Sequence, residues 1–189
     1  ITLDIDDTCD PVHGGQQLSL FNAHYDTRCF LPIHIYDVSS GKPVVVFLRE
    51  GKTPSGKEVA LVLKHLVRRI AKHWPETRIT FRGDSHYGRP EAMEWCEANG
   101  IDYIFGLAGN SVLHRHVYEA GDALKVARAE QGADKLRGFT ETRYAAASWT
   151  TGRPVIARFE ATTQGFDVRY IVTTLTGEAQ HLYENVYCQ

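Results

Sequence analysis

The first six residues, Ile1-Thr2-Leu3-Asp4-Ile5-Asp6, carry the pattern that is most informative about the fold. Apolar and polar side chains alternate with a period of two, which predicts a β-strand. Leu3 and Ile5 then share one face, and Asp4 and Asp6 share the other. Because a carboxylate at the end of an apolar strand is costly unless charge is needed there, Asp6 is a candidate functional residue.

Three further stretches before the first helix have strand character. The last two are joined by Ser39-Ser40-Gly41-Lys42, which has the composition of a turn. The three stretches are residues 18–25, 29–37 and 43–49. They predict an antiparallel meander.

The apolar spacing becomes helical after Ser55, which is the expected N-cap of a helix that ends before Pro75. Its apolar face consists of Val59, Leu63, Leu66, Ile70 and Trp74. A strand pattern returns at residues 78–84, and a helix at about 90–99 and a strand at 103–107 follow. Strand, helix and strand in this order predict a right-handed parallel crossover.

The remaining residues continue the alternation of helices and strands. We expect a helix at about 112–130, strands at 139–149, 154–161 and 167–175, and the start of a helix near Leu182. The fold class is therefore α/β, with a mixed sheet of about five strands and flanking helices. We expect one domain over residues 1–189, truncated at both ends, with 108–150 as an insertion or variable region within it.

Composition narrows the class of protein. A chain of 189 residues is the size of one domain, and 43% hydrophobic and 23% charged residues are ordinary values for a globular protein. No apolar run approaches the roughly 20 residues that cross a bilayer, so we expect a soluble protein with no membrane partner. The four cysteines stand singly, which predicts reduced thiols and a cytoplasmic location. The tryptophans Trp74, Trp95 and Trp149 are expected to fill the core.

Charge is distributed unevenly along the chain. The net charge is −2, but residues 42–89 carry eleven Lys and Arg against four acids. Such a basic segment is either a surface for phosphates or a solvated face. Four of its cations lie on one stripe of the predicted helix, opposite the apolar face, and are candidate DNA contacts: Lys57, Lys64, Arg68 and Lys72.

Asp84 ends the strand at 78–84 as Asp6 ends the first one. The two carboxylates would meet if these strands are neighbours, whereas Asp7 is expected to point away. Carboxylates that converge from separate strands are what Mg²⁺ needs for phosphoryl transfer. An aspartate at a strand end is more commonly a turn or cap residue, so this interpretation depends on the wider pattern.

Four segments supply that wider pattern, and together they resemble the bacterial insertion-sequence transposases of the DDE superfamily, which have an RNase H-like catalytic domain. The segments follow in order and span nearly the whole chain: Leu3-Asp4-Ile5-Asp6-Asp7-Thr8, Pro11-Val12-His13-Gly14-Gly15-Gln16-Gln17, Asn22-Ala23-His24-Tyr25-Asp26 and Arg82-Gly83-Asp84-Ser85-His86-Tyr87. The resemblance implies that Asp6 and Asp84 are catalytic residues and ligands of Mg²⁺ or Mn²⁺.

The resemblance also implies a third acid and a set of partners. In the family the third acid is a Glu on a later helix, seven residues after a Tyr that contacts DNA near the cleaved end. Tyr187 matches this Tyr, so the acid would lie beyond Gln189, and we expect the fragment to be inactive. Glu184 does not match the position. The full-length protein would act in the bacterial cytoplasm, associated with the nucleoid when bound to DNA, as a homodimer that cleaves transposon ends and joins them to target DNA.

Several alternatives stay open. His86 could touch metal or DNA, although a histidine in a surface loop is more commonly without such a role. The chain could be a non-catalytic or DNA-binding remnant of a decayed mobile element. It could also be a metal-dependent nuclease of the same fold, which hydrolyses DNA without joining it.

Overall fold

The computed structural model describes residues 1–189 and contains two compact units, Ile1–Asp102 (unit 1) and Tyr103–Gln189 (unit 2). The predicted fold class, mixed α/β with flanking helices, is confirmed, but the main sheets of the two units together have eight strands where about five were predicted. Two compact units do not test whether the chain is one catalytic domain, or whether residues 108–150 are an insertion, and both stay predictions. None of the helices has the length and apolar character of a membrane span.

The main sheet of unit 1 has β1 at its centre. Its four strands are β1 (Thr2–Asp7), β5 (Ile33–Asp37), β6 (Lys42–Phe47) and β7 (Thr80–Gly83), in the order β6-β5-β1-β7. β5 runs antiparallel to both β1 and β6, whereas β7 runs parallel to β1. Leu3 and Ile5 are buried, as the alternation predicted.

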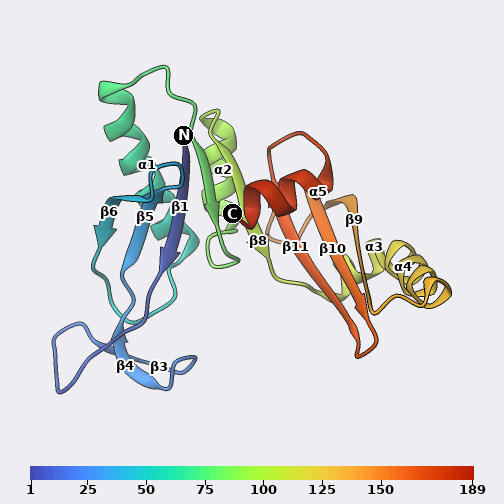
Figure 1. The fold of residues 1–189 in the computed structure, drawn as a ribbon. Helices are drawn as coiled ribbons and strands as arrows, with labels where there is room; N and C mark the ends of the chain where they lie inside the picture. The colour runs from blue at the N-terminus through green and yellow to red at the C-terminus, as the bar shows by residue number, and fades with distance from the viewer. The chain divides into compact units, whose positions relative to one another are not determined.

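A small second sheet in unit 1 corrects the predicted meander. It consists of β2 (Asp10–Pro11), β3 (Leu20–Asn22) and β4 (Thr27–Phe30), in the order β2-β4-β3. The predicted strand at 29–37 is divided between β4 and β5, because the chain leaves the small sheet at Pro32, whose carbonyl accepts from the N–H of Thr8. The meander of the main sheet is therefore β1, β5 and β6, and Figure 1 shows β3 and β4 beyond the end of β1.

The helices of unit 1 begin and end close to the predicted positions. α1 (Gly56–His73) starts at a capping box in which Ser55 accepts from the N–H of Glu58 and Glu58 accepts from the N–H of Ser55. α2 (Pro90–Ala98) packs against α1. Trp74 corrects a prediction, since it follows the end of α1 and is 65% exposed.

Unit 2 is built on an antiparallel sheet. Its strands are β8 (Asp102–Leu107, which begins at the last residue of unit 1), β9 (Lys135–Tyr144), β10 (Arg153–Thr162) and β11 (Phe166–Thr173), in the order β8-β11-β10-β9. β9 begins earlier than predicted and ends at Tyr144, because all ten of its residues pair with β10.

Four helical elements accompany this sheet, two between β8 and β9 and two after β11. The predicted helix at 112–130 is two helices, α3 (Ser111–His116) and α4 (Tyr118–Gln131), which are separated at Val117. α5 (Ala179–His181) continues into η1 (Leu182–Tyr187), a π-helical segment. Leu182 and Tyr183 pack in a core cluster with Ile104, Ile156 and Ile171.

Candidate active site

Two aspartates of unit 1 lie at the carboxyl ends of neighbouring parallel strands. The register pairs Ile5 of β1 with Gly83 of β7, so Asp6 and Asp84 are the next residues along the two strands. The side chain of Asp84 is 49% exposed, and Asp6 is exposed as well. The two carboxylates were expected to meet if their strands are neighbours, and β1 and β7 are neighbours. The catalytic and metal-binding roles of the two aspartates stay predictions.

The electrostatics of Asp6 reflect this proximity. Although Asp6 is exposed, partial burial of its carboxyl raises its pKa, and the N–H of Asp7, which donates to Asp6 Oδ1 at 2.8 Å, opposes that rise. The negative charges of Asp84, Asp7 and Asp4 raise the pKa further. A cation placed among these carboxylates would remove the repulsion.

Asp7 corrects a prediction, because its side chain does not point away from this region. It is only 3% exposed, and its Oδ2 accepts from the Tyr87 hydroxyl at 3.0 Å. The Nδ1 of His86 lies 3.3 Å from the same oxygen and 3.9 Å from Asp84 Oδ2. The backbone N–H of His86 donates to Asp84 Oδ1 at 2.8 Å. Asp7, Asp84, His86 and Tyr87 thus form one hydrogen-bonded group.

Asp4 is on the same face of β1 as Asp6 but has its own cation. Arg82, which is paired with Asp4 in the register, donates from Nε to Oδ1 at 3.0 Å and from Nη2 to Oδ2 at 2.8 Å. The Arg82 side chain is 9% exposed. This two-point ion pair compensates Asp4, whereas next to the strand ends no Lys or Arg ion pair compensates Asp6, and the Nδ1 of His86 lies within 4 Å of both Asp7 and Asp84.

Tyr25 is a neighbour of the acids that the sequence did not identify. It lies in the turn between β3 and β4, is 39% exposed, and has the ring of His24 edge-on at 4.8 Å. Burial raises the pKa of its phenol, and the charges of Asp7, Asp6 and Asp84 contribute to the rise. The segment Asn22–Asp26 belonged to the resemblance, but nothing in the sequence joined it to the acids.

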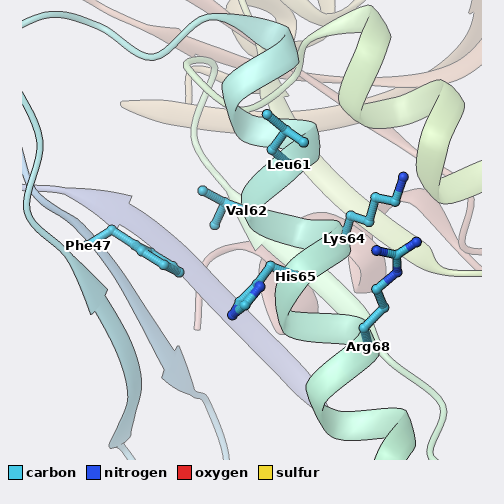
Figure 2. Close-up of a pocket in the computed structure, with 6 residues that line it drawn as sticks. All are labelled: Phe47, Leu61, Val62, Lys64, His65 and Arg68. Atoms are coloured by element: carbon cyan, nitrogen blue, oxygen red, sulfur yellow. The ribbon is translucent and has the colours of Figure 1, made fainter.

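The predicted DNA contacts lie on other elements. Lys57, Lys64, Arg68 and Lys72 are on α1, and none of them is among the groups that act on Asp6. Figure 2 shows Lys64 and Arg68 extending from α1 away from Phe47 of β6, whereas Val62 and His65 point towards Phe47. Together with Leu61, these side chains line an open groove along α1.

Tyr187, the remaining predicted contact, is in η1 of unit 2. Its ring centroid is 5.6 Å from that of Tyr183, and it packs against the core cluster of that unit. The structure therefore explains Tyr187 as a packing residue of unit 2. A contact between Tyr187 and DNA stays a prediction.

The donor atoms at the strand ends suit a hard divalent cation. Asp6 and Asp84 offer carboxylate oxygens, which Mg²⁺ and Mn²⁺ prefer, and burial, together with the charges of the neighbouring acids, raises the pKa of Asp6. Within either unit, no group of three or more Asp, Glu, His or Cys side chains could hold a metal ion by itself. The two aspartates would thus supply part of a coordination shell.

Comparison with models of protein families gives a match over residues 1–189 to the transposase DDE domain, group 1. The chain belongs to this family. Transposases of the DDE type generally use a divalent metal ion for nucleotidyl transfer, which agrees with the exposed carboxylates at the strand ends. No curated protein sequence matches the chain.

A solved transposase structure has a similar fold. A piggyBac transposase, determined by cryo-EM as a synaptic complex with hairpin DNA, aligns with a TM-score of 0.54 and 12% identity over 94% of this chain and 34% of that one. The transposase domain therefore spans about a third of the length of that protein, and at this identity the likeness concerns the fold alone. Endonuclease V of Ciona intestinalis, in complex with a DNA containing inosine followed by a ribo-adenosine, aligns with a TM-score of 0.43 and 9% identity over 98% and 75% of the two chains.

Proposed function

We propose that this transposase domain supplies two of the metal-binding acids for phosphodiester cleavage and strand transfer at transposon ends. The observation that carries the proposal is the pairing of Ile5 with Gly83, which places Asp6 and Asp84 side by side at the ends of parallel strands. The piggyBac transposase of similar fold was solved with DNA, which supports DNA as the substrate.

Asp6 and Asp84 would hold Mg²⁺ or Mn²⁺. When bound, such an ion lowers the pKa of a coordinated hydroxyl and neutralises charge that develops on phosphate oxygens. Asp6 and Asp84 fix the place where this chemistry occurs, since their strands belong to a hydrogen-bonded sheet. Arg82 keeps Asp4 out of the site by binding both of its oxygens.

The finer parts of the proposal concern the whole protein. The third acid is supplied by residues outside the sequence described here, and the domain by itself is therefore inactive. The full-length protein acts as a homodimer on paired DNA ends in the cytoplasm. Lys57, Lys64, Arg68 and Lys72 contact DNA phosphates from α1. His86 contacts DNA or metal, and Tyr187 contacts DNA near the cleaved end.

Titration with Mn²⁺ tests the metal site in this domain without any need for activity. Paramagnetic broadening is followed by NMR for the parent chain and for Asp6→Ala and Asp84→Ala. We expect weak binding that either substitution abolishes, because the two carboxylates share one site. Asp122→Ala is the matched control, since Asp122 lies in unit 2 and its side chain is 49% exposed, as that of Asp84 is. Binding that survives both substitutions would remove the basis for the site.

Product analysis tests the reaction of a longer protein that includes the third acid. Labelled transposon-end DNA is incubated with Mg²⁺ and a target duplex, and the products are separated on a denaturing gel. Joined strands are expected from a transposase. Nicked strands without joined products would instead indicate a nuclease of the same fold.

A further inference from the structure

We propose that Asp7 is a positioning residue whose buried carboxylate ties the loop Asp84–Tyr87 to the end of β1 and so holds Asp84 beside Asp6. The proposal rests on the proposed function of Asp6 and Asp84, and it assigns a separate role to the third aspartate of this region. Asp7 touches neither substrate nor metal in this role.

The contacts of Asp7 cross between two strands that are distant in sequence. A single oxygen, Oδ2, lies 3.0 Å from the Tyr87 hydroxyl and 3.3 Å from His86 Nδ1. These partners are 80 and 79 residues away along the chain. They directly follow Asp84 and Ser85, so that their positions determine how the loop leaves β7.

Asp7 and Tyr87 are both buried, and their polar atoms therefore need hydrogen-bond partners within the protein. The Asp7 side chain is 3% exposed and pairs with His86 but with no Lys or Arg, so its charge is stabilised chiefly by the hydrogen bonds it accepts. Tyr87 is fully buried, and an unpaired hydroxyl there would also be costly. Burial and the Asp7 charge raise the pKa of Tyr87, so the phenol stays protonated and donates. The Asp7 carboxylate and the Tyr87 hydroxyl therefore each need the hydrogen bond that they share.

The contacts of Asp7 with His86 and Tyr87 are called the Asp7 clamp below, and His86 links this clamp directly to Asp84. Its backbone N–H donates to Asp84 Oδ1 at 2.8 Å, and its ring Nδ1 lies between Asp7 and Asp84. An Nδ1–H that donates to Asp7 fixes the ring plane and leaves Nε2 directed away from Asp7. The orientation of the Asp84 carboxylate consequently depends on Asp7 through one intermediate residue.

Two substitutions at Asp7 separate the effect of its hydrogen-bond acceptor from the effect of its negative charge. Asp7→Asn retains an acceptor oxygen for Tyr87 but removes the charge, whereas Asp7→Ala removes both. Tyr87→Phe removes one donor and leaves the charge, and it keeps the test valid if Asp7→Ala does not fold. Asp10→Asn is the control, because Asp10 is exposed and is only three residues further along.

The readouts are amide hydrogen exchange in residues 84–87 and Mn²⁺ affinity by paramagnetic broadening. For Asp7→Ala we expect exchange in the loop to be about tenfold faster or more, and Mn²⁺ affinity to fall by a similar factor. Asp7→Asn should restore most of the protection, and Tyr87→Phe should give a smaller change in the same direction. Asp10→Asn should leave both unchanged.

Two results would overturn the proposal. Unchanged exchange together with complete loss of Mn²⁺ binding in Asp7→Asn would make Asp7 a metal ligand. Unchanged exchange and unchanged affinity in Asp7→Ala and Tyr87→Phe would show that the clamp does not position Asp84. Failure of the proposed function is recognised separately, since Mn²⁺ would then bind equally well to Asp6→Ala and Asp84→Ala whatever the loop does.

Discussion

The contact between β1 and β7 directly before the two acids can be tested by adding one methyl group at Gly83. A Cβ at this position would lie 2.9 Å from Ile5 Cγ2, 3.0 Å from Ile5 O and 3.1 Å from Tyr87 Cδ2, where ordinary contacts are 3.4–4 Å. Ile5 and Tyr87 are both buried, so the strands must separate by about 0.3–0.5 Å to relieve the overlap. Overpacking of this kind costs about 1–3 kcal/mol.

Gly83→Ala should therefore lower the free energy of unfolding by about 1–3 kcal/mol, measured by urea denaturation. It should also weaken Mn²⁺ binding, because the strand ends that carry Asp6 and Asp84 move apart. Gly15→Ala is the control, since nothing lies within 4 Å of a Cβ there, and it should change stability by less than about 0.5 kcal/mol. Equal midpoints for Gly83→Ala and the parent would refute the close packing of these strands.

Three further substitutions test other parts of the structure. Asp6→Asn should raise the melting temperature without metal at neutral pH, because burial and the neighbouring acids raise the pKa of Asp6 and so disfavour its ionised form in the folded state. It should also abolish stabilisation by Mg²⁺, and a lower melting temperature without metal would contradict this unfavourable environment. Ser55→Ala should cost about 1 kcal/mol in urea unfolding through loss of the capping box, with Ser148→Ala, an exposed loop position, as the control. Hydrogen bonds from Lys135 and Arg137 lower the pKa of Glu160 to about 2, so its contribution to stability is present above the ordinary carboxyl pKa and is lost as the pH falls towards 2. Glu160→Gln should therefore flatten the acid side of a plot of melting temperature against pH. An unchanged slope would show that these ion pairs add nothing to stability.

Local patterns in the sequence predicted the elements whose stability is local. α1 has its capping box and a repeating apolar face within eighteen residues, and β1 alternates over six. Both therefore appear where they were predicted. That β1 and β7 are parallel neighbours was only a condition in the sequence, and the register of the structure meets it.

Predictions that depended on distant contacts were less accurate. Residues 18–37 were interpreted as two strands of the main sheet, but pairing with Asp10 and Pro11 draws part of them into a small sheet. The helix at 112–130 divides at Val117, for which its sequence gives no signal, and Trp74 is exposed although it continues an apolar stripe. Periodicity reports which face a residue occupies, and it does not report what lies opposite.

The sequence by itself determined the family of this protein, the two strand-end acids and the mixed α/β class. Only the tertiary structure decided the role of Asp7 and the proximity of Tyr25 to the acids. The physical reason is that the partners of Asp7 lie about eighty residues away, at the end of another strand. A carboxylate becomes a clamp only when folding excludes water from it and brings the donors that replace that water.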